Sequence, residues 1–549
     1  MSADTTISLA LTHAQLGWPS PNEILRPSGE GARIFSELVR AKIGRALLQF
    51  DDAEGAAVGV LISDSYTVHT EPPLAVVVTF PRAVTDRTLR SLQRLAWNFS
   101  HSPTLITVEP NLLRVWTCCE PPDSRRALNE FIVHELGGPN LLEVGAPPLE
   151  RRAAQALHWA NLVSGQFFRD RADRFDRNQR ADQMLLGNLR DIREKLQKAG
   201  LRDDDVCHDL LARIVFVQFL FDRKDSDGNA ALTPAKLVRL KEAGELRKEH
   251  TSLSSILADY DETYRLFDWL NAKFNGDLFP GKGDTTEKRA VGWAKEKKIV
   301  TPKHLSLLAD FIKGEIDMPS GQRCLWPQYA FDVIPLEFIS SVYETFVTER
   351  AADEGIFYTP PHLVDFILDR VLPWNSNQWD LTVLDPACGS GIFLVKVFQR
   401  LIHRWKRSHP EQPVRVDTLR RLLERNIFGV DKDPHAVRVA CFSLYLAMCD
   451  EIEPKHYWSQ VVFPEMRNHR LIPADFFKED IPGFRSKEDK GTYDLIVGNA
   501  PWGEKLLTDE AREWAATSAQ SWPIQNKGIG TLFLPKSRSG KLLSRGNRM

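Results

Sequence analysis

The stretch LTVLDPACGSGIFLVKVF, residues 381–398, decides the fold expected for this chain. An apolar run leads into the turn Asp385–Gly391, and a second apolar run with helical spacing follows the turn. This order predicts a buried strand, a tight turn and a helix. Gly389 and Gly391 permit positive φ and let backbone N–H groups approach a ligand at the helix N-terminus, where an anion is favoured. We therefore expect an α/β fold with a ligand site at this turn.

A second unit of the same kind follows at the right distance. Ile427–Val430 is apolar and predicts the next strand, Asp431 comes directly after it, and residues 435–448 have the pattern of an amphipathic helix. In this layout an acidic residue at the tip of the second strand holds a ribose diol. The first turn reads Asp-Pro-x-x-Gly-Ser-Gly instead of Gly-x-Gly-x-x-Gly, which disfavours a nicotinamide dinucleotide as the ligand.

The tetrapeptide Asn499-Ala500-Pro501-Trp502 follows a third apolar run, residues 493–498. An amide side chain, a backbone carbonyl, a proline turn and an aromatic face side by side suit a flat group that bears an amine. The same residue types are common in ordinary turns and cores, so the tetrapeptide gains meaning only from the two units upstream.

These residues, in this order, resemble the N6-adenine DNA methyltransferases that use S-adenosylmethionine. The resemblance is specific over about residues 325–505. It implies that the cofactor is held by a segment that closes over its methionine end, by the glycine turn, by the ribose carboxylate and by an adenine-side acidic motif. The positions of this chain that match are Tyr358, Thr359, Pro360, Asp385, Ala387, Gly389, Gly391, Asp431, Asp475 and Phe476.

The catalytic motif of that family, Asn-Pro-Pro-aromatic, matches Asn499, Ala500, Pro501 and Trp502, with Ala500 in place of the first proline. The resemblance implies that the Asn499 side-chain oxygen and the Ala500 carbonyl accept hydrogen bonds from the adenine amine. An alanine keeps the backbone carbonyl that a proline would supply. Trp502 would stack on an adenine swung out of the duplex. No metal is implied.

The motif order resembles the gamma arrangement of type I modification subunits and fused restriction-modification enzymes. It implies a site-specific enzyme that acts on double-stranded DNA in restriction-modification or phage defence, with a specificity or restriction subunit as a further partner. Three alternatives stay open: a protein-glutamine methyltransferase, an RNA-base methyltransferase, and a non-catalytic remnant that binds cofactor or DNA.

Composition indicates a large globular protein. The chain has 549 residues, a formal net charge of −2 and seven cysteines without a Cys-x-x-Cys pair, which favours a reducing cytosol over a disulfide framework. No apolar run approaches the length of a membrane span, and the N-terminus lacks a basic signal region. We expect a cytoplasmic protein without a membrane partner.

Five regions are predicted along the chain. Residues 1–125 form a mixed α/β domain with strands at 56–62, 74–80, 104–108 and 113–116, either a nuclease or a degenerate relative that lacks a Glu-x-Lys. Residues 126–160 form a linker and residues 161–325 a helical domain. Residues 326–535 form the methyltransferase domain, and residues 536–549 a basic tail.

The methyltransferase sheet is expected to be incomplete. The family's sheet has seven strands, and the sequence predicts four, at 382–384, 427–430, 471–474 and 494–497. We expect the last of these strands to lie at an open edge. A chain truncated at its C-terminus would give this pattern, and a second polypeptide would then complete the sheet.

Overall fold

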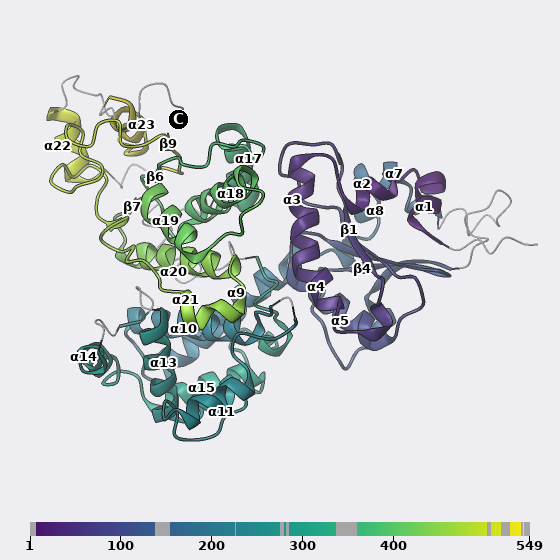
Figure 1. The fold of residues 1–549 in the computed structure, drawn as a ribbon, viewed down its shortest axis with the longest axis horizontal. Helices are drawn as coiled ribbons and strands as arrows, with labels where there is room; N and C mark the ends of the chain where they lie inside the picture. Colours follow the sequence, from purple (N-terminus) through teal and green to yellow (C-terminus); the bar gives the residue numbers. More distant parts are fainter. Residues whose placement is uncertain are drawn as a thin grey trace, which may run out of the picture. The chain divides into compact units, whose positions relative to one another are not determined.

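The computed structural model describes residues 7–137, 154–225, 227–274, 279–280, 285–335, 359–501, 507–517, 528–539 and 542. The chain divides into two compact units, drawn in Figure 1. The N-terminal unit comprises Met1–Asn188, Lys224–Asn229 and Gly321–Pro335. The C-terminal unit comprises Leu189–Arg223, Ala230–Ser320 and Leu336–Met549.

A five-stranded sheet forms the centre of the N-terminal unit. Its strands lie in chain order: β1 (Ala57–Leu61), β2 (Ala75–Thr79), β3 (Thr104–Glu109), β4 (Leu112–Thr117) and β5 (Ile132–Gly137). Only β2 and β3 are parallel, because the helix α5 (Asp86–Phe99) connects them as a crossover. The four strands predicted for this region are confirmed.

Side chains alternate between the two faces of this sheet. Val76 and Val78 pack against α5 and against α3 (Glu30–Val39), while Val77 packs with Trp18 and Phe167 on the other face. That second face is covered by α1 (Leu9–Leu16), α2 (Pro21–Leu25), α7 (Trp159–Val163) and α8 (Gln166–Arg169). Two separate cores therefore hold the sheet between them.

The sequence missed β5. It lies within residues 126–160, which were predicted to be a linker, and it pairs antiparallel with β4. Glu135 of β5 forms an ion pair with Arg114 of β4 at 3.3 Å. Because β5 is a partly exposed edge strand, it has no long apolar run to reveal it.

A late segment of the chain, Gly321–Pro335, packs in the N-terminal unit. The backbone N–H of Leu325 and the hydroxyl of Tyr329 both donate to Asn188 Oδ1, at 2.9 and 3.1 Å. The N–H of Ala330 donates to Asn98 Oδ1 at 2.9 Å. The residues from 326 to 335, predicted to open the methyltransferase domain, thus share a core with the first strands of the chain.

The first part of the C-terminal unit, Leu189–Arg223 with Ala230–Ser320, is helical, whereas the ends of the helical domain predicted over residues 161–325 belong to the N-terminal unit. Its most apolar helix is α10 (Asp204–Asp222), which carries the buried Arg213 paired with Glu296 at 2.5 Å. The other helices are α9 (Ala181–Lys198, most of it in this unit), α11 (Pro234–Glu242), α12 (Leu253–Leu257), α13 (Tyr260–Phe274), α14 (Thr286–Glu296) and α15 (Pro302–Lys313). Among the described residues, no helix is long and apolar enough to cross a membrane.

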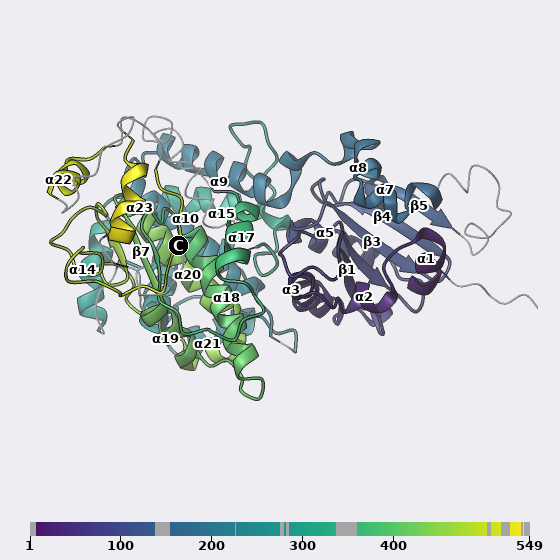
Figure 2. The same cartoon turned by 90° about the horizontal axis from the view of Figure 1, so that it is seen from above.

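The second part of the C-terminal unit contains a parallel sheet. Its order is β8 (Leu471–Pro473), β7 (Ile427–Asp431), β6 (Val383–Asp385) and β9 (Leu495–Ile496). These are the four strands that the sequence predicted, and β9 lies at one end of the described order. The accompanying helices include α17 (Pro361–Val371), α18 (Ile392–Ser408), α19 (Val416–Asn426), α20 (Pro434–Asp450), α22 (Asp509–Thr517) and α23 (Gly530–Ser539) (Figure 2).

Candidate cofactor and catalytic site

The candidate site lies where the parallel strands of the C-terminal unit end. Asp385 is the last residue of β6 and Asp431 the last residue of β7, so both stand at the carboxyl edge of the sheet. The loop between them is fastened to β7, because the N–H of Cys388 donates to the Val430 carbonyl and that of Gly389 donates to Asp431 Oδ2, both at 2.9 Å. The glycine turn and the second carboxylate therefore form one arrangement.

Asp385 is almost fully buried, with 1% of its surface exposed. Its Oδ1 accepts a hydrogen bond from the N–H of Ala387 at 3.1 Å. A Cβ added to Gly498 would lie 2.3 Å from the same oxygen, so only glycine fits beside this carboxylate. Burial and the neighbouring Asp431 raise the pKa of Asp385 to about 8, which favours its protonated form.

Asp431 is partly exposed at the strand tip. Both of its oxygens accept backbone hydrogen bonds, Oδ2 from Gly389 and Oδ1 from Asp433 at 2.9 Å. Burial raises the pKa of this carboxyl as well. Each carboxylate oxygen has a second acceptor position, so these bonds orient the group and leave it capacity to accept from a ligand hydroxyl.

Gly391 precedes the first turn of α18 with φ of 91°. Because Gly391 has no side chain, it cannot accept hydrogen bonds from the first N–H groups of this helix. These N–H groups favour the binding of an anion at the helix N-terminus. A Cβ at this position would lie 2.9 Å from the Ala440 Cβ of α20. Replacement of Gly391 would therefore disturb helix packing as well as any ligand.

Asn499 meets a segment that lies 140 residues earlier in the chain. Its Nδ2 donates to Thr359 Oγ1 at 3.2 Å, and Pro360, the next residue, is the N-cap of α17. The sequence placed both residues in the site for separate reasons, and the structure brings them into contact. With the amide nitrogen directed at Thr359, the amide oxygen is the atom that faces away from that hydroxyl.

A buried network of charges fixes α17 to α18. Asp365 contacts Lys396 Nζ at 3.2 Å and Arg400 Nη2 at 3.1 Å, and Arg400 also contacts Asp369 at 2.8 Å. The Arg400 guanidinium lies 4.4 Å from the centre of the Trp374 ring. All four charged side chains are buried, and the sequence analysis did not identify them. The spacing of Lys396 and Arg400, four residues apart in an apolar helix, was the available signal.

The predicted adenine-side motif, Asp475 and Phe476, is held by contacts within the protein. Asp475 Oδ1 accepts from the N–H of Phe477 at 2.8 Å. Phe476 has only 3% of its surface exposed and stacks on Phe533 of α23, with ring centres 5.3 Å apart. The Phe476 side chain thus belongs to the core, and cofactor contact by this residue stays a prediction.

Lys536 corrects part of the prediction of a basic tail. It lies on α23 with no exposed surface, forms an ion pair with Glu479 at 2.8 Å and has its Nζ 4.9 Å from the centre of the Phe476 ring. Burial lowers the pKa of this lysine. The first cation of the predicted tail is therefore a core residue, since aromatic faces and one carboxylate replace water around it.

The predicted catalytic loop lies against the start of α23. A Cβ on Gly530 would approach the Pro501 carbonyl oxygen to 2.9 Å, and Ala500 packs against the same core as Phe476. Tyr358 and Trp502, the two remaining predicted site residues, lie outside the described residues. The described residues contain no group of three or more His, Cys, Asp or Glu that could hold a metal ion.

A family model described as N-6 DNA Methylase matches residues 337–528, the part of the chain that carries this site. Over these residues the chain is similar to that family. The match starts before Thr359 and ends after the Asn499–Pro501 loop, so it includes all four strands of the parallel sheet. The N-terminal unit lies before it.

Two curated methyltransferases are similar to parts of the chain. The chain is 24% identical to the type II restriction enzyme and methyltransferase RM.Eco57I of Escherichia coli, over 34% of this chain and 24% of the relative. It is 30% identical to the adenine-specific methyltransferase PglX of Streptomyces coelicolor, over 20% of this chain and 9% of the relative. The matches thus span a quarter or less of these relatives.

Solved structures also resemble the chain. The type IIL restriction-modification enzyme MmeI, determined in complex with DNA, is 14% identical with a TM-score of 0.40, over 64% of this chain and 48% of that one.

Proposed function

We propose that this chain transfers the methyl group of S-adenosylmethionine to the N6 amine of adenine in double-stranded DNA, within a restriction-modification or phage-defence system. The observation that carries the proposal is the hydrogen bond between Asn499 and Thr359, which joins the predicted catalytic loop to the predicted cofactor segment. The adenine-specific names of the relatives disfavour the protein-glutamine alternative, and the description of the matching family as N-6 DNA Methylase favours DNA over RNA.

The residues around the glycine turn fit the cofactor. The uncapped first turn of α18 suits the methionine carboxylate, and the Asp431 carboxylate suits the ribose hydroxyls. Gly389 and Gly391 lie at φ of 51° and 91° and place no side chain of their own in this turn. When bound, S-adenosylmethionine supplies an electrophilic methyl group.

The catalytic loop would activate the amine. The exocyclic amine of adenine is a weak nucleophile, because its lone pair is delocalised into the ring. Hydrogen bonds from the amine to the Asn499 side-chain oxygen and the Ala500 carbonyl would localise that lone pair towards the methyl group. Thr359 would hold the Asn499 amide in the orientation that presents its oxygen, and Trp502 would stack on the extruded base.

Methyl transfer from labelled S-adenosylmethionine, offered to DNA, RNA and protein in parallel, tests the proposal. We expect label in adenine of DNA only, and none with Asn499→Ala. Asp431→Ala should weaken cofactor binding at least tenfold in calorimetry. Label in protein or RNA but not DNA would contradict the assignment of substrate, and cofactor binding that Asp431→Ala leaves unchanged would contradict the site.

We also propose that a second polypeptide, such as a specificity or restriction subunit, pairs with β9. This strand has β6 on one side and no other described strand on the other, although Ile496 is buried and Asn499 follows closely. The N–H of Tyr493, just before β9, donates to the Leu542 carbonyl at 3.0 Å, but a strand without a neighbouring strand on one side would still leave the adjacent catalytic loop loosely held. We therefore expect the isolated chain to bind cofactor weakly and to methylate DNA poorly. Robust, site-specific methylation by the isolated chain would contradict this proposal alone.

A further inference from the structure

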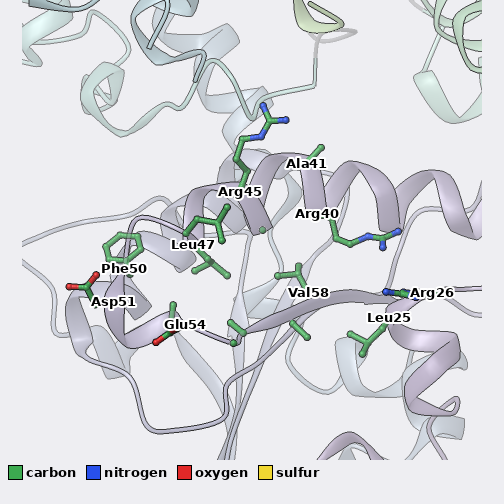
Figure 3. Close-up of a pocket in the computed structure, with 16 residues that line it drawn as sticks. Leu25, Arg26, Arg40, Ala41, Arg45, Leu47, Phe50, Asp51, Glu54 and Val58 are labelled. Atoms are coloured by element: carbon green, nitrogen blue, oxygen red, sulfur yellow. The ribbon is translucent and has the colours of Figure 1, made fainter. Parts of the chain in front are cut away.

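The N-terminal unit has a hollow of about 970 Å³ beside the edge of its sheet (Figure 3). Sixteen residues between Leu25 and Val58 line it, from α2, the π-helix η1 (Arg40–Gly44), α4 (Arg45–Leu47) and β1. Six of these positions carry small residues, which leave space above the backbone: Ala41, Gly44, Ala53, Gly55, Ala56 and Ala57. It lies outside the residues that match the methylase family.

One end of the hollow is cationic. Arg26, which ends α2, and Arg40, which begins η1, present their guanidinium groups at the same end (Figure 3). Arg40 Nε donates to the Ser36 carbonyl at 3.2 Å, and among the described residues neither arginine has a carboxylate partner. Like charges at one end of the hollow repel each other, and an anion bound between them reduces that repulsion. Guanidinium groups match the geometry of a phosphate.

The other end is acidic, and the floor between the two ends is apolar. Asp51 and Glu54 lie at the end opposite Arg26 and Arg40 (Figure 3). Glu54 lies 3.7 Å from Arg82 Nη2, whereas the Asp51 carboxylate forms no bond with another described side chain. Phe50 and the buried side chains of Leu47 and Val58 belong to the core beneath the hollow.

We propose that this hollow binds a nucleoside phosphate. The phosphate lies between Arg26 and Arg40, the base packs on the apolar floor with Phe50, and an exocyclic amine of the base donates to Asp51. The volume falls in the range of small-molecule sites, about 300–1,000 Å³. Adenine, cytosine and guanine carry an exocyclic amine, and thymine does not. A free nucleotide and a nucleotide within single-stranded DNA offer the same chemistry.

Calorimetry on the full chain tests the proposal with four probes: dAMP, dTMP, inorganic phosphate and a short oligodeoxyadenylate. The variant is Arg26→Ala with Arg40→Ala, which removes the cationic end. The matched control is Arg87→Ala, an exposed arginine of α5 that does not line the hollow. Asp51→Asn tests the acidic end. Asp431→Ala distinguishes this hollow from the proposed cofactor site, which also has affinity for an adenosine group.

We expect dAMP to bind wild type more tightly than dTMP or phosphate, and at least tenfold more weakly after loss of Arg26 and Arg40. Arg87→Ala should bind as wild type does, and Asp51→Asn should bring dAMP and dTMP closer together. Tighter binding of the oligonucleotide than of dAMP would identify single-stranded DNA as the source, and the reverse a free nucleotide. The proposal is overturned if no probe binds, if the double variant binds as wild type does, or if Asp431→Ala alone abolishes dAMP binding.

Discussion

The buried charge network between α17 and α18 gives a prediction that can be measured without any substrate. Asp365→Ala removes the carboxylate that contacts both Lys396 and Arg400, and leaves these two cations buried. Loss of one partner from a buried ion pair costs about 3–5 kcal/mol, because the remaining charge stays in a medium of low polarity. We expect the free energy of unfolding of the C-terminal unit, measured by urea titration, to fall by that amount.

An exposed ion pair of the same unit provides the control. Glu424 lies 3.5 Å from Arg420 on α19, with 43% and 36% of the side chains exposed, so Glu424→Ala should cost only about 0.2–1 kcal/mol. A double-mutant cycle with Lys396→Met isolates the pair itself, and we expect a coupling of at least about 1 kcal/mol. If Asp365→Ala costs no more than Glu424→Ala, the reasoning about burial is wrong.

Loss of the Asp365 carboxylate should also affect the geometry of the candidate site. Because α17 starts two residues after Thr359, a loosened α17 would let the Thr359 hydroxyl move relative to Asn499. A displacement of about 1 Å in a reacting group can cost on the order of a hundredfold in rate. In the assembly that methylates DNA, we therefore expect Asp365→Asn, which keeps the shape of the side chain, to lower kcat more than it raises KM. A rise in KM alone would refute a positioning role.

Three further predictions follow from the site. Asn499→Ala should abolish methylation and leave cofactor affinity within about twofold, since its hydrogen bond matters mainly in the transition state; equal activity of the two proteins would contradict the proposed chemistry. Asp385→Asn should stabilise the chain increasingly as pH rises. The pKa of Asp385 is about 8 when folded and about 3.9 when unfolded, so its contribution to stability is full below pH 4 and is lost between pH 4 and pH 8, with an upper bound of about 6 kcal/mol. If the difference between variant and wild type in urea titration is the same at pH 5 and pH 8, this reasoning is wrong. Gly498→Ala should lower the melting temperature, because its Cβ would lie 2.3 Å from Asp385 Oδ1, and an unchanged melting temperature would show that the strand end can shift.

The sequence predicted the parallel sheet because its strands are short apolar runs that end in glycine or aspartate. Val383, Val430 and Leu495 are buried, and Asp385 and Asp431 follow at the strand tips where the layout requires them. In such strands the apolar residues of the sequence pattern are the residues that are buried, so the local sequence is sufficient to predict the strand. The contact between Asn499 and Thr359 is a consequence of that topology, and the motif order indicated it only through the family resemblance.

Other features depend on partners distant in the sequence. β5 is recognisable only through its pairing with β4, and Arg400 only through Asp365 and Asp369 on another helix. Lys536 has the sequence context of a solvent-exposed tail, and its burial depends on Glu479 and three aromatic rings contributed by the loop after β8. A charged residue has no local signal for burial, because the groups that replace its water come from elsewhere in the chain.

The late segment Gly321–Pro335 joins the N-terminal unit only after much of the chain has been synthesised. All strands of the first sheet are present once β5 has left the ribosome. The backbone N–H groups that donate to Asn188 and Asn98, those of Leu325 and Ala330, are synthesised much later. At about 5–20 residues per second, the chain from Asn188 to Ala330 takes on the order of ten seconds to synthesise. During that interval Tyr329 has not been synthesised and cannot stack on Trp97. In the folded protein the centres of these two rings are 5.5 Å apart. We therefore expect the nascent N-terminal unit to expose the Trp97 face that Tyr329 later covers, and a fragment that ends at residue 188 to keep this face exposed.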